Sequence, residues 1–515
     1  MSITSLWDTL THWILLHIPL WVVITLVIHL VVLGGVAYMI LLERKVASWV
    51  QDRIGPNRVG LGFGIIPVLK DFHFWGLGQP LADGLKFIMK EDYRARGIDM
   101  ILFTVAPGVM IITVIISIAV IPWGGTKQGH TWIDVTQEAH SGQDPAQAAI
   151  DNLPNSYYAA PPADLDLSSV PQEKRAEAYS KAVRDNIDVE RTPHMRGPSQ
   201  IIANITYRYP FQIASLNIGV LYVLATLSLA VYGVVVGAWA SNNKYSFLGG
   251  LRATANMISY EIPLGLAVLC IVTMYGTLDL GKIVDMQAHD WAGIVPAWNI
   301  FTQPLAFLMF LICIHAEANR APFDTAEAEQ ELVGGYHTEY SSMRFALFFL
   351  AEYAGMVTTS AVLVALFLGG WHLPWGLTGG IDKAHPEVTT SLLMCVGRTL
   401  VFLVKTLAII FVFMWVRWSL PRFRFDQIMM LAWRALIPLS LAMLLMTAIV
   451  LYLMRDHHRP NFWIDGQLAV VFFIANVVLL ALTMLITRSL PPPPETNRKI
   501  RVPRSRFART PLPAA

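Results

Sequence analysis

Residues Glu317 to Tyr353 read EANRAPFDTAEAEQELVGGYHTEYSSMRFALFFLAEY and lie between two apolar runs, each long enough to cross a bilayer. The part from Glu317 to Glu339 carries six acids, and Arg320 is its only Lys or Arg. A further acid, Glu352, lies inside the next apolar run, where an ionised carboxylate is costly unless it faces partners or water. A solvated loop that sets topology explains the loop acids equally well, but it does not explain Glu352.

The acidic stretch also contains a local helix signal. Asp324 and Glu327 have the Asp-x-x-Glu spacing of a capping box, which predicts a short helix from Thr325. The glycine pair at 334–335 would end this helix. Glu327 and Glu331 would then lie one turn apart, with their like charges opposed.

The composition excludes a soluble domain. The chain has 515 residues, of which 55% are hydrophobic and 14% charged, and its mean hydropathy is +0.50. These values are typical of an all-α polytopic membrane protein. Cys270, Cys313 and Cys395 occur singly, so a CxxC-based iron–sulfur cluster or zinc site is not supported. The chain also has no Gly-rich phosphate loop or dinucleotide fingerprint, so any electron carriers belong to other proteins.

Apolar runs predict the transmembrane helices. Nine runs have about the 20 residues that a membrane helix needs: 13–42, 98–121, 216–239, 262–280, 298–318, 345–370, 400–418, 428–454 and 468–486. Lys and Arg concentrate in the loops on one side, which places the N-terminus outside and the C-terminus in the cytoplasm. The acidic loop is then also inside, against the usual bias, which favours a specific role for it.

Residues 78–92, GQPLADGLKFIMKED, predict a short amphipathic helix with Leu81, Leu85, Ile88 and Met89 on one face. Either the membrane interface or a partner subunit would cover this face.

Three further segments fall outside the predicted spans. The polar segment 122–208 predicts a helix over 171–190 and loop elsewhere. Residues 1–12 lack a basic region, so we expect no ordinary cleaved signal peptide. The Pro-rich basic tail, 488–515, is expected to be disordered.

Five cytoplasmic segments resemble one family, in order and in spacing. They are ERKVASWVQDRIGPNRVG (43–60), QPLADGLKFIMKED (79–92), and the segments 237–266, 317–353 and 419–442. Together they resemble the membrane subunit of respiratory complex I that is called the H subunit in bacteria and subunit 1 in mitochondria. The resemblance covers about residues 13–121 and 209–454. It implies a multi-pass subunit of a proton-translocating NADH:quinone oxidoreductase in the bacterial inner membrane.

The family subunit closes the quinone chamber and begins the hydrophilic axis that leads to the proton pumps. Matching motifs imply that the quinone-tunnel residues are Arg44, Arg53, Asp83, Lys86, Arg417 and Arg422. They imply that the acidic proton path is formed by Glu261, Glu317, Asp324, Glu327, Glu329, Glu331, Glu339 and Glu352, with Glu43 as an additional member. So many acids with few bases cannot all ionise in a low dielectric, so we expect them to titrate as a coupled set.

The resemblance also implies cofactors and partners. Quinone (ubiquinone or another type) is the substrate, while FMN and the iron–sulfur clusters lie on other subunits. This chain is expected to contain no catalytic residue of its own, no cofactor and no metal. Its implied partners are the peripheral-arm iron–sulfur and quinone-site subunits, the small membrane subunits that lead to the antiporter-like subunits, and membrane lipid. Nucleic acid is not among them.

The sequence departs from the family pattern in four places. Residues 65–76 are extra, and Asn256 replaces a usual Gln. The loop 122–208 is expanded, and the ninth span with its tail is added to the usual eight. The expected division of the chain is therefore 13–121, an extracytoplasmic insertion at 122–208, 209–454 with the acidic loop at 319–344, an extra helix at 466–487, and the tail at 488–515.

Two other readings remain open. One is the homologous membrane anchor of a hydrogenase or of a ferredoxin- or F420-linked complex. The other is a stand-alone secondary transporter, which predicts an internal repeat with broken helices. The sequence shows no convincing repeat.

Overall fold

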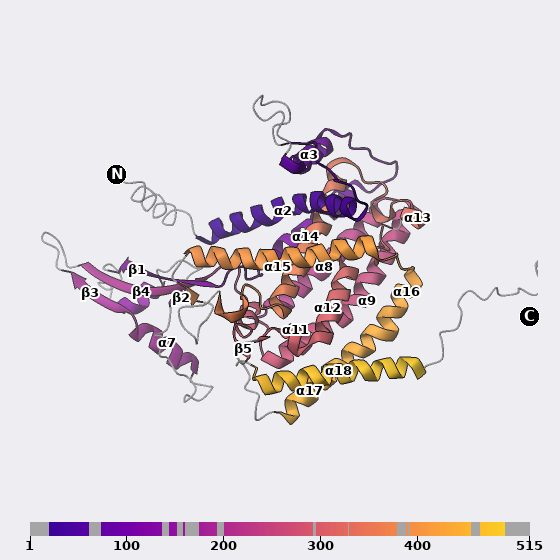
Figure 1. Cartoon of the computed structure of the whole chain (residues 1–515). Coiled ribbons are helices and arrows are strands. Elements are labelled where there is room, and N and C mark those ends of the chain that lie inside the picture. Colours follow the sequence, from indigo (N-terminus) through magenta and orange to yellow (C-terminus); the bar gives the residue numbers. More distant parts are fainter. Residues whose placement is uncertain are drawn as a thin grey trace, which may run out of the picture.

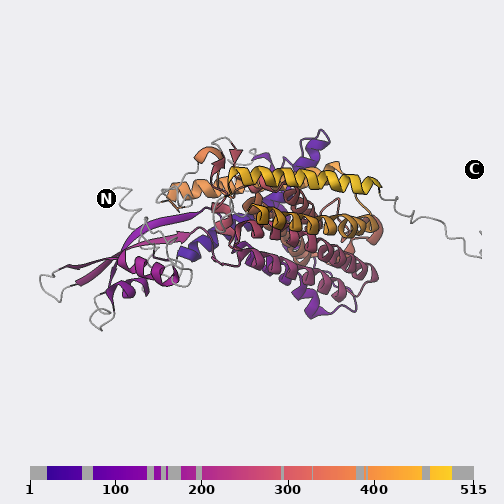
Figure 2. The ribbon, with the colours of Figure 1, turned by 90° about the horizontal axis from the view of Figure 1, so that it is seen from below.

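A bundle of long helices forms most of the molecule, and strands extend from one end of it (Figures 1 and 2). The computed structural model describes residues 20–60, 74–135, 144–151, 158–159, 175–192, 200–291, 295–327, 329–377, 388–389, 392–454 and 464–489. Some sequence predictions concern residues outside these ranges: 1–12, most of 65–76, and nearly all of the tail.

Each bundle helix overlaps one of the predicted apolar runs. They are α2 (Leu20–Val50), α4 (Met100–Ile118), α8 (Gly219–Ala240), α9 (Lys244–Tyr275), α12 (Pro304–Glu317), α14 (Ser342–Phe367), α15 (Leu392–Ser419), α17 (Ile437–Leu453) and α18 (Gly466–Ser489). Within the described residues, seven helices are long and apolar enough to cross a membrane, and α12 is a shorter apolar helix. The chain is therefore an α-helical, multi-pass membrane protein, as predicted.

Caps place both ends of α9 away from the predicted ones. The Asn243 side chain accepts a hydrogen bond from the Tyr245 backbone N–H at 3.0 Å, so α9 begins at Lys244, well before residue 262. Gly276, at φ 69°, ends α9. Apolar content alone missed this start because the first turns of α9 are polar.

Two further predictions of helix bounds were wrong. The run 298–318 is not one helix, because Pro304 has no N–H and the chain bends at Gln303 (φ −130°, ψ 60°). The short helix α11 (Asn299–Thr302) precedes this break. At the other end of the chain, α16 (Phe425–Met430) and the π-helix η6 (Leu431–Leu436) run directly into α17, so the eighth span begins before residue 428.

Helix α14 lies at the centre of the bundle. In its membrane-spanning stretch of 18 residues, 78% of the residues are buried, whereas the corresponding share for α18, at the periphery, is 17%. Gly369 and Gly370, at φ 67° and 52°, turn the chain where α14 ends. Lys405 Nζ on α15 donates hydrogen bonds to the carbonyls of Leu368, Gly370 and His372, at 2.5–3.0 Å. These bonds provide partners for backbone carbonyls in the turn that follows α14.

The insertion contains a sheet, and the prediction of loop there was wrong. Strand β1 (Thr126–Asp134) pairs antiparallel with β4 (Gln200–Pro210), with Thr126 opposite Pro210. The other edge of β4 pairs with β2 (Tyr158–Ala159) and β3 (Asp188–Thr192), and β7 (Val388–Thr389) pairs parallel with β1. The partner strands come from distant parts of the chain, so no local pattern reveals them.

Alternation along β4 explains how this sheet is covered. The buried residues Ile201, Ala203 and Ile205 point to one face. They pack with apolar side chains of α6 (Pro145–Asp151) and α7 (Arg175–Asp185). The predicted end of the helix over 171–190 was wrong, because α7 ends at Asp185 and β3 begins at Asp188.

The remaining short elements are η2 (Phe74–Gly76), α3 (Gln79–Met89), α10 (Leu280–Asp285), β5 (Asp290–Trp291), β6 (Val295–Pro296), α13 (Glu329–Leu332), η4 (Gly335–His337) and η5 (Pro374–Gly376). Helix α3 confirms the helix predicted within 78–92. It lies, with α13, away from the end of the bundle that carries the sheet (Figure 1). The division of the chain into five segments stays a prediction.

Candidate functional site

A cavity of about 800 Å³ lies between α2, α3, α14 and the last turns of α15. Its volume falls in the range of about 300–1,000 Å³ that is usual for small-molecule sites. Apolar side chains form much of its wall: Ala37, Ile40, Leu41, Phe87, Phe345, Phe349, Leu350 and Trp418. Charged side chains also reach it: Glu43, Arg44, Asp83, Lys86, Lys90, Arg320 and Arg417.

The outer wall of the cavity is α3. Arg44 Nη1 lies 3.2 Å from Asp83 Oδ2, and Gln79 donates to Asp83 Oδ1 at 3.1 Å. Lys86 Nζ lies 3.9 Å from the same carboxylate. Asp83 therefore joins α2 to α3 at the cavity rim, although the two cations are well exposed and such pairs contribute little to stability.

The inner wall contains a buried carboxylate. Glu43 is 7% exposed, accepts a hydrogen bond from the Tyr353 hydroxyl and forms an ion pair with Arg417. Helix α2 continues beyond residue 42 to Val50, so Glu43 and Arg44 lie on the helix and not at its end. A buried charge requires such partners, and here α14 and α15 supply them.

Arg320 connects this wall with the centre of the bundle. Its guanidinium lies 4.1 Å from the centre of the Tyr353 ring, and Nη2 lies 3.7 Å from Glu352 Oε2. Glu352 also accepts a hydrogen bond of 2.5 Å from the Tyr336 hydroxyl. Burial and the neighbouring Glu352 raise the pKa of Tyr336, so the phenol keeps its proton and donates it to this bond.

A second, smaller cavity of about 40 Å³ is lined in part by Glu352. Glu317, Asn319 and Glu352 line it together with apolar residues. One water needs about 10–15 Å³ and several polar partners, and this cavity offers both. The arrangement can therefore hold water between the two carboxyl groups.

Asp324 lies in the turn that follows Arg320. Its Oδ1 accepts a hydrogen bond from the Glu327 backbone N–H at 3.3 Å, and its backbone carbonyl accepts one from Arg422. Burial raises the pKa of Asp324, and Glu327 raises it further, while Arg422 opposes them. This side-chain bond is the one that a capping box predicts, but α13 begins at Glu329 and not at Thr325.

The predicted opposition of Glu327 and Glu331 was also wrong, because Glu327 precedes the helix. Glu331 is exposed and forms an ion pair with Arg252 of α9. Its charge is therefore compensated by a base more than 70 residues away in sequence.

Four of the six residues predicted to line the quinone tunnel lie at the large cavity, and two do not. Arg44, Asp83, Lys86 and Arg417 line the large cavity. Arg53 is exposed beyond the end of α2, and Arg422 contacts Asp324; neither is among the lining residues.

Only some of the acids predicted for the proton path line one of the two cavities. Glu43, Glu352 and Glu317 lie at the two cavities. Glu261 is exposed on α9 and accepts a hydrogen bond from Ser228, while Glu339 accepts one of 2.7 Å from Asn243. The side chain of Glu329 is outside the described part of the chain.

Three residues of the site were not predicted: Arg320, Tyr353 and Tyr336. Arg320 is isolated among acids in the sequence, which indicates an ion pair, but the sequence does not show which acid is its partner. Among the described residues, no group of three or more His, Cys, Asp and Glu is arranged to hold a metal ion.

Fold and site together define a multi-pass membrane protein with a charged, apolar-walled cavity at one end of its helix bundle. A family model described as NADH dehydrogenase matches residues 23–141 and 198–448. The chain belongs to this NADH dehydrogenase family. The match omits residues 142–197, which include α7 and β3, and it stops before α18.

Relatives give the same family, and each is named as the H subunit of an NADH-quinone oxidoreductase. The protein of Cytophaga hutchinsonii is 38% identical over 405 residues, which cover 79% of this chain and 89% of that protein. The protein of Flavobacterium johnsoniae is 37% identical over 429 residues, covering 83% and 94%. The protein of Geobacter sulfurreducens is 38% identical over 428 residues, covering 83% and 94%. These relatives are subunits of an enzyme complex, and this chain is a subunit of that kind.

Proposed function

We propose that this chain is the membrane subunit of a proton-translocating NADH:quinone oxidoreductase and that its large cavity forms part of the quinone chamber. One observation carries the proposal. Arg44, Asp83, Lys86 and Arg417, chosen by motif from two distant parts of the sequence, line a single cavity with an apolar wall. An apolar wall suits an isoprenoid tail, and a few polar groups suit a quinone head.

The chemistry divides between subunits. FMN and iron–sulfur clusters on partner subunits supply the electrons, and this chain holds the quinone. Reduction of a quinone places negative charge on its carbonyl oxygens, which take up protons to give the quinol. Arg44, Lys86 and Arg417 at the cavity would stabilise that developing charge.

The same geometry supports coupling to proton movement. From the cavity, Arg417 pairs with Glu43, Glu43 with Tyr353, and Arg320 lies between Tyr353 and Glu352. Charge arriving on a quinone would change the proton occupancy of such a coupled set. Glu317 follows across the small cavity, and the further proposed members are Glu261, Asp324, Glu327, Glu329, Glu331 and Glu339.

The proposed setting is the bacterial inner membrane, with the N-terminus outside and the C-terminus in the cytoplasm. Peripheral-arm subunits would cover the cavity, and small membrane subunits would continue the acidic path. Relatives named for NADH-quinone oxidoreductase favour this reading over a hydrogenase anchor or a transporter. Mass spectrometry of what co-purifies with the tagged chain in mild detergent tests the partners: flavin and iron–sulfur subunits are expected, and a lone chain would contradict the proposal.

The quinone role is tested with Arg44→Ala and Arg417→Ala in the purified complex. We expect each variant to lower NADH:quinone turnover by about tenfold or more, because a charge that stabilises the reduced quinone is lost. NADH oxidation by a soluble artificial acceptor should stay unchanged. The matched control is Lys282→Ala, since Lys282 is exposed on α10 and is not among the residues lining the cavity. Normal quinone turnover in both arginine variants would disprove the role of the cavity.

A further inference from the structure

Polar contacts join α3 to its neighbouring elements. None of its 11 residues, all of which are described, is buried, although the helix forms one wall of the large cavity. Leu81, Leu85, Ile88 and Met89 of its apolar face are 47–84% exposed. Within this chain, the position of this wall therefore depends on the bonds that its polar groups make and on the contact between the Phe87 and Phe345 rings.

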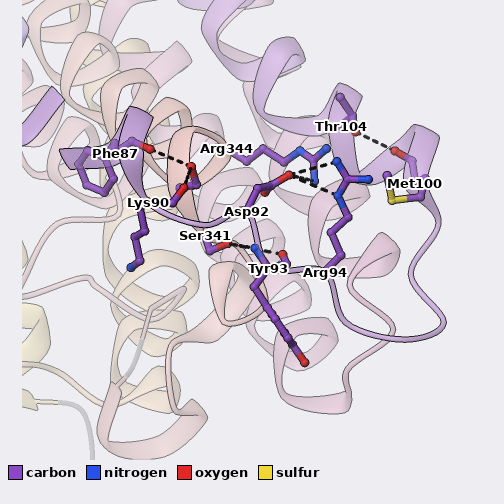
Figure 3. A network of polar contacts seen from close by, with 10 residues as sticks. Phe87, Lys90, Asp92, Tyr93, Arg94, Met100, Thr104, Ser341 and Arg344 are labelled. Atoms are coloured by element: carbon purple, nitrogen blue, oxygen red, sulfur yellow. Dashed lines mark hydrogen bonds and ion pairs between the residues drawn. The ribbon is translucent and has the colours of Figure 1, made fainter. Parts of the chain in front are cut away.

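The C-terminal end of α3 is bonded to the start of α14. The Ser342 hydroxyl lies 2.8 Å from the Phe87 carbonyl oxygen and 3.0 Å from that of Lys90, and it donates to this pair. Next to it, Ser341 Oγ accepts a hydrogen bond from the Tyr93 backbone N–H at 2.9 Å (Figure 3). The last carbonyls of a helix have no partner within the helix, so Ser342 supplies one from another element.

Ser342 has a backbone conformation that serine rarely adopts. Its φ is 53°, in the left-handed region, where a side chain meets its own backbone. Such a conformation costs free energy and persists where the surroundings require it. A glycine would adopt it more readily, but a glycine has no hydroxyl with which to reach α3.

An ion pair lies beside these hydrogen bonds. Arg344 Nη1 is 3.4 Å from Asp92 Oδ2, and Arg94 Nη2 is 3.3 Å from the same oxygen (Figure 3). The Arg344 guanidinium also lies 5.3 Å from the centre of the Phe103 ring on α4, and its side chain is only 16% exposed. Arg344 thus ties the segment after α3 to both α14 and α4.

We propose that Asp92, Ser342 and Arg344, here called the α3 clasp, are positioning residues that set the affinity of the cavity for quinone. The clasp contributes no lining atom itself, but the first turn of α14 also carries Met343 and Phe345, which do line the cavity. A shift of α3 relative to that turn changes the distance between two walls of the same cavity. The inference rests on the proposed quinone function.

The test uses the purified whole complex and the variant Ser342→Gly. Glycine adopts the positive φ without strain and removes the hydroxymethyl side chain that carries the hydrogen bonds to α3. We expect the KM for a short-chain quinone to rise by about fivefold with kcat within about twofold of wild type, because binding of substrate and transition state weaken equally. Arg344→Ala should act in the same way, and Arg344→Lys, which keeps the charge, should recover most of the affinity. The control is Thr104→Val, since the Thr104 hydroxyl bonds Met100 of its own helix.

The outcomes separate this inference from the function on which it rests. If Arg417→Ala lowers quinone turnover while Ser342→Gly and Arg344→Ala leave KM unchanged, the α3 clasp is overturned and the quinone cavity stands. If kcat and the amount of assembled complex fall together at unchanged KM, the clasp is merely structural and the inference is overturned. If Arg417→Ala has no effect, the proposed function fails first. Should Arg344→Ala not assemble, Ser342→Gly decides alone.

Discussion

Arg320 Nη2 lies 3.7 Å from Glu352 Oε2, and the two side chains are only 6% and 5% exposed. Arg320 lines the large cavity, and Glu352 lines the small one. This ion pair therefore joins the two cavities through the wall between them. Under the proposed function, a quinone whose reduction changes the charge of the first cavity would act on the acid of the second through this guanidinium.

The first prediction concerns the stability of this pair. Arg320→Ala leaves Glu352 buried without its cation, and breaking a buried pair costs about 3–5 kcal/mol. Adding Glu352→Gln to Arg320→Ala removes the unpaired charge, so the double variant should melt at a higher temperature than Arg320→Ala alone. Thermal unfolding of the purified complexes measures this. Additive effects of the two substitutions would mean that the pair is not coupled.

The second prediction concerns proton movement across the small cavity. Glu317→Gln and Glu352→Gln keep the shape of each side chain and remove a group that exchanges a proton. We expect each to lower the proton uptake coupled to quinone reduction in proteoliposomes by about tenfold or more. Glu91→Gln is the control, because Glu91 is exposed. Pumping at the control level in both variants would exclude these acids from the path.

The third prediction concerns pH. The pKa of Asp324 is raised by burial, and next by Glu327. The folded state therefore binds this proton more tightly than the unfolded state does, and it loses stability as the pH rises from the ordinary aspartate range through the raised pKa. Asp324→Asn does not ionise and escapes this loss. Its melting temperature relative to wild type should increase as the pH rises from the ordinary aspartate range; a difference that stays constant or falls would contradict the assignment.

The fourth prediction concerns α18, which lies beyond the family match. Asn476 Nδ2 donates to the Thr302 carbonyl at 3.2 Å and to Gln303 Oε1 at 3.1 Å, at the break between α11 and α12. Asn476→Leu removes this donor and should destabilise the protein by about 0.6–1.7 kcal/mol, the scale of hydrogen bonds between membrane helices.

Melting of the purified complex in detergent measures this loss. The control for α18 is Val478→Leu, since Val478 is 60% exposed on the same helix. An equal change in both variants would show that Asn476 does not dock α18 onto the break.

The sequence predicted where the helices lie better than it predicted where they begin and end. The apolar runs located the bundle helices, and the pattern of residues 78–92 located α3. Errors came where run length alone set the bounds of a helix. Polar first turns hid the start of α9, and Pro304 divided a run that had been predicted as one helix. The strands of the insertion were missed because β1 pairs with β4, far along the chain.

The site shows the same division. Motif matching selected Arg44, Asp83, Lys86 and Arg417, which line one cavity. It also selected Glu331, whose partner is Arg252, and it passed over Arg320 and Tyr353. The sequence shows which residues carry charge, but which charged residues lie next to each other depends on the tertiary structure.

By itself, the sequence determined the class of protein, the places of its membrane helices and the family, because apolar run length and motif order are properties of the chain. Only the tertiary structure decided which acids are buried, which bases compensate them and where a cavity opens. Those features depend on side chains from α2, α3, α14 and α15 meeting in space, and on the free energy of removing each charge from water once they meet.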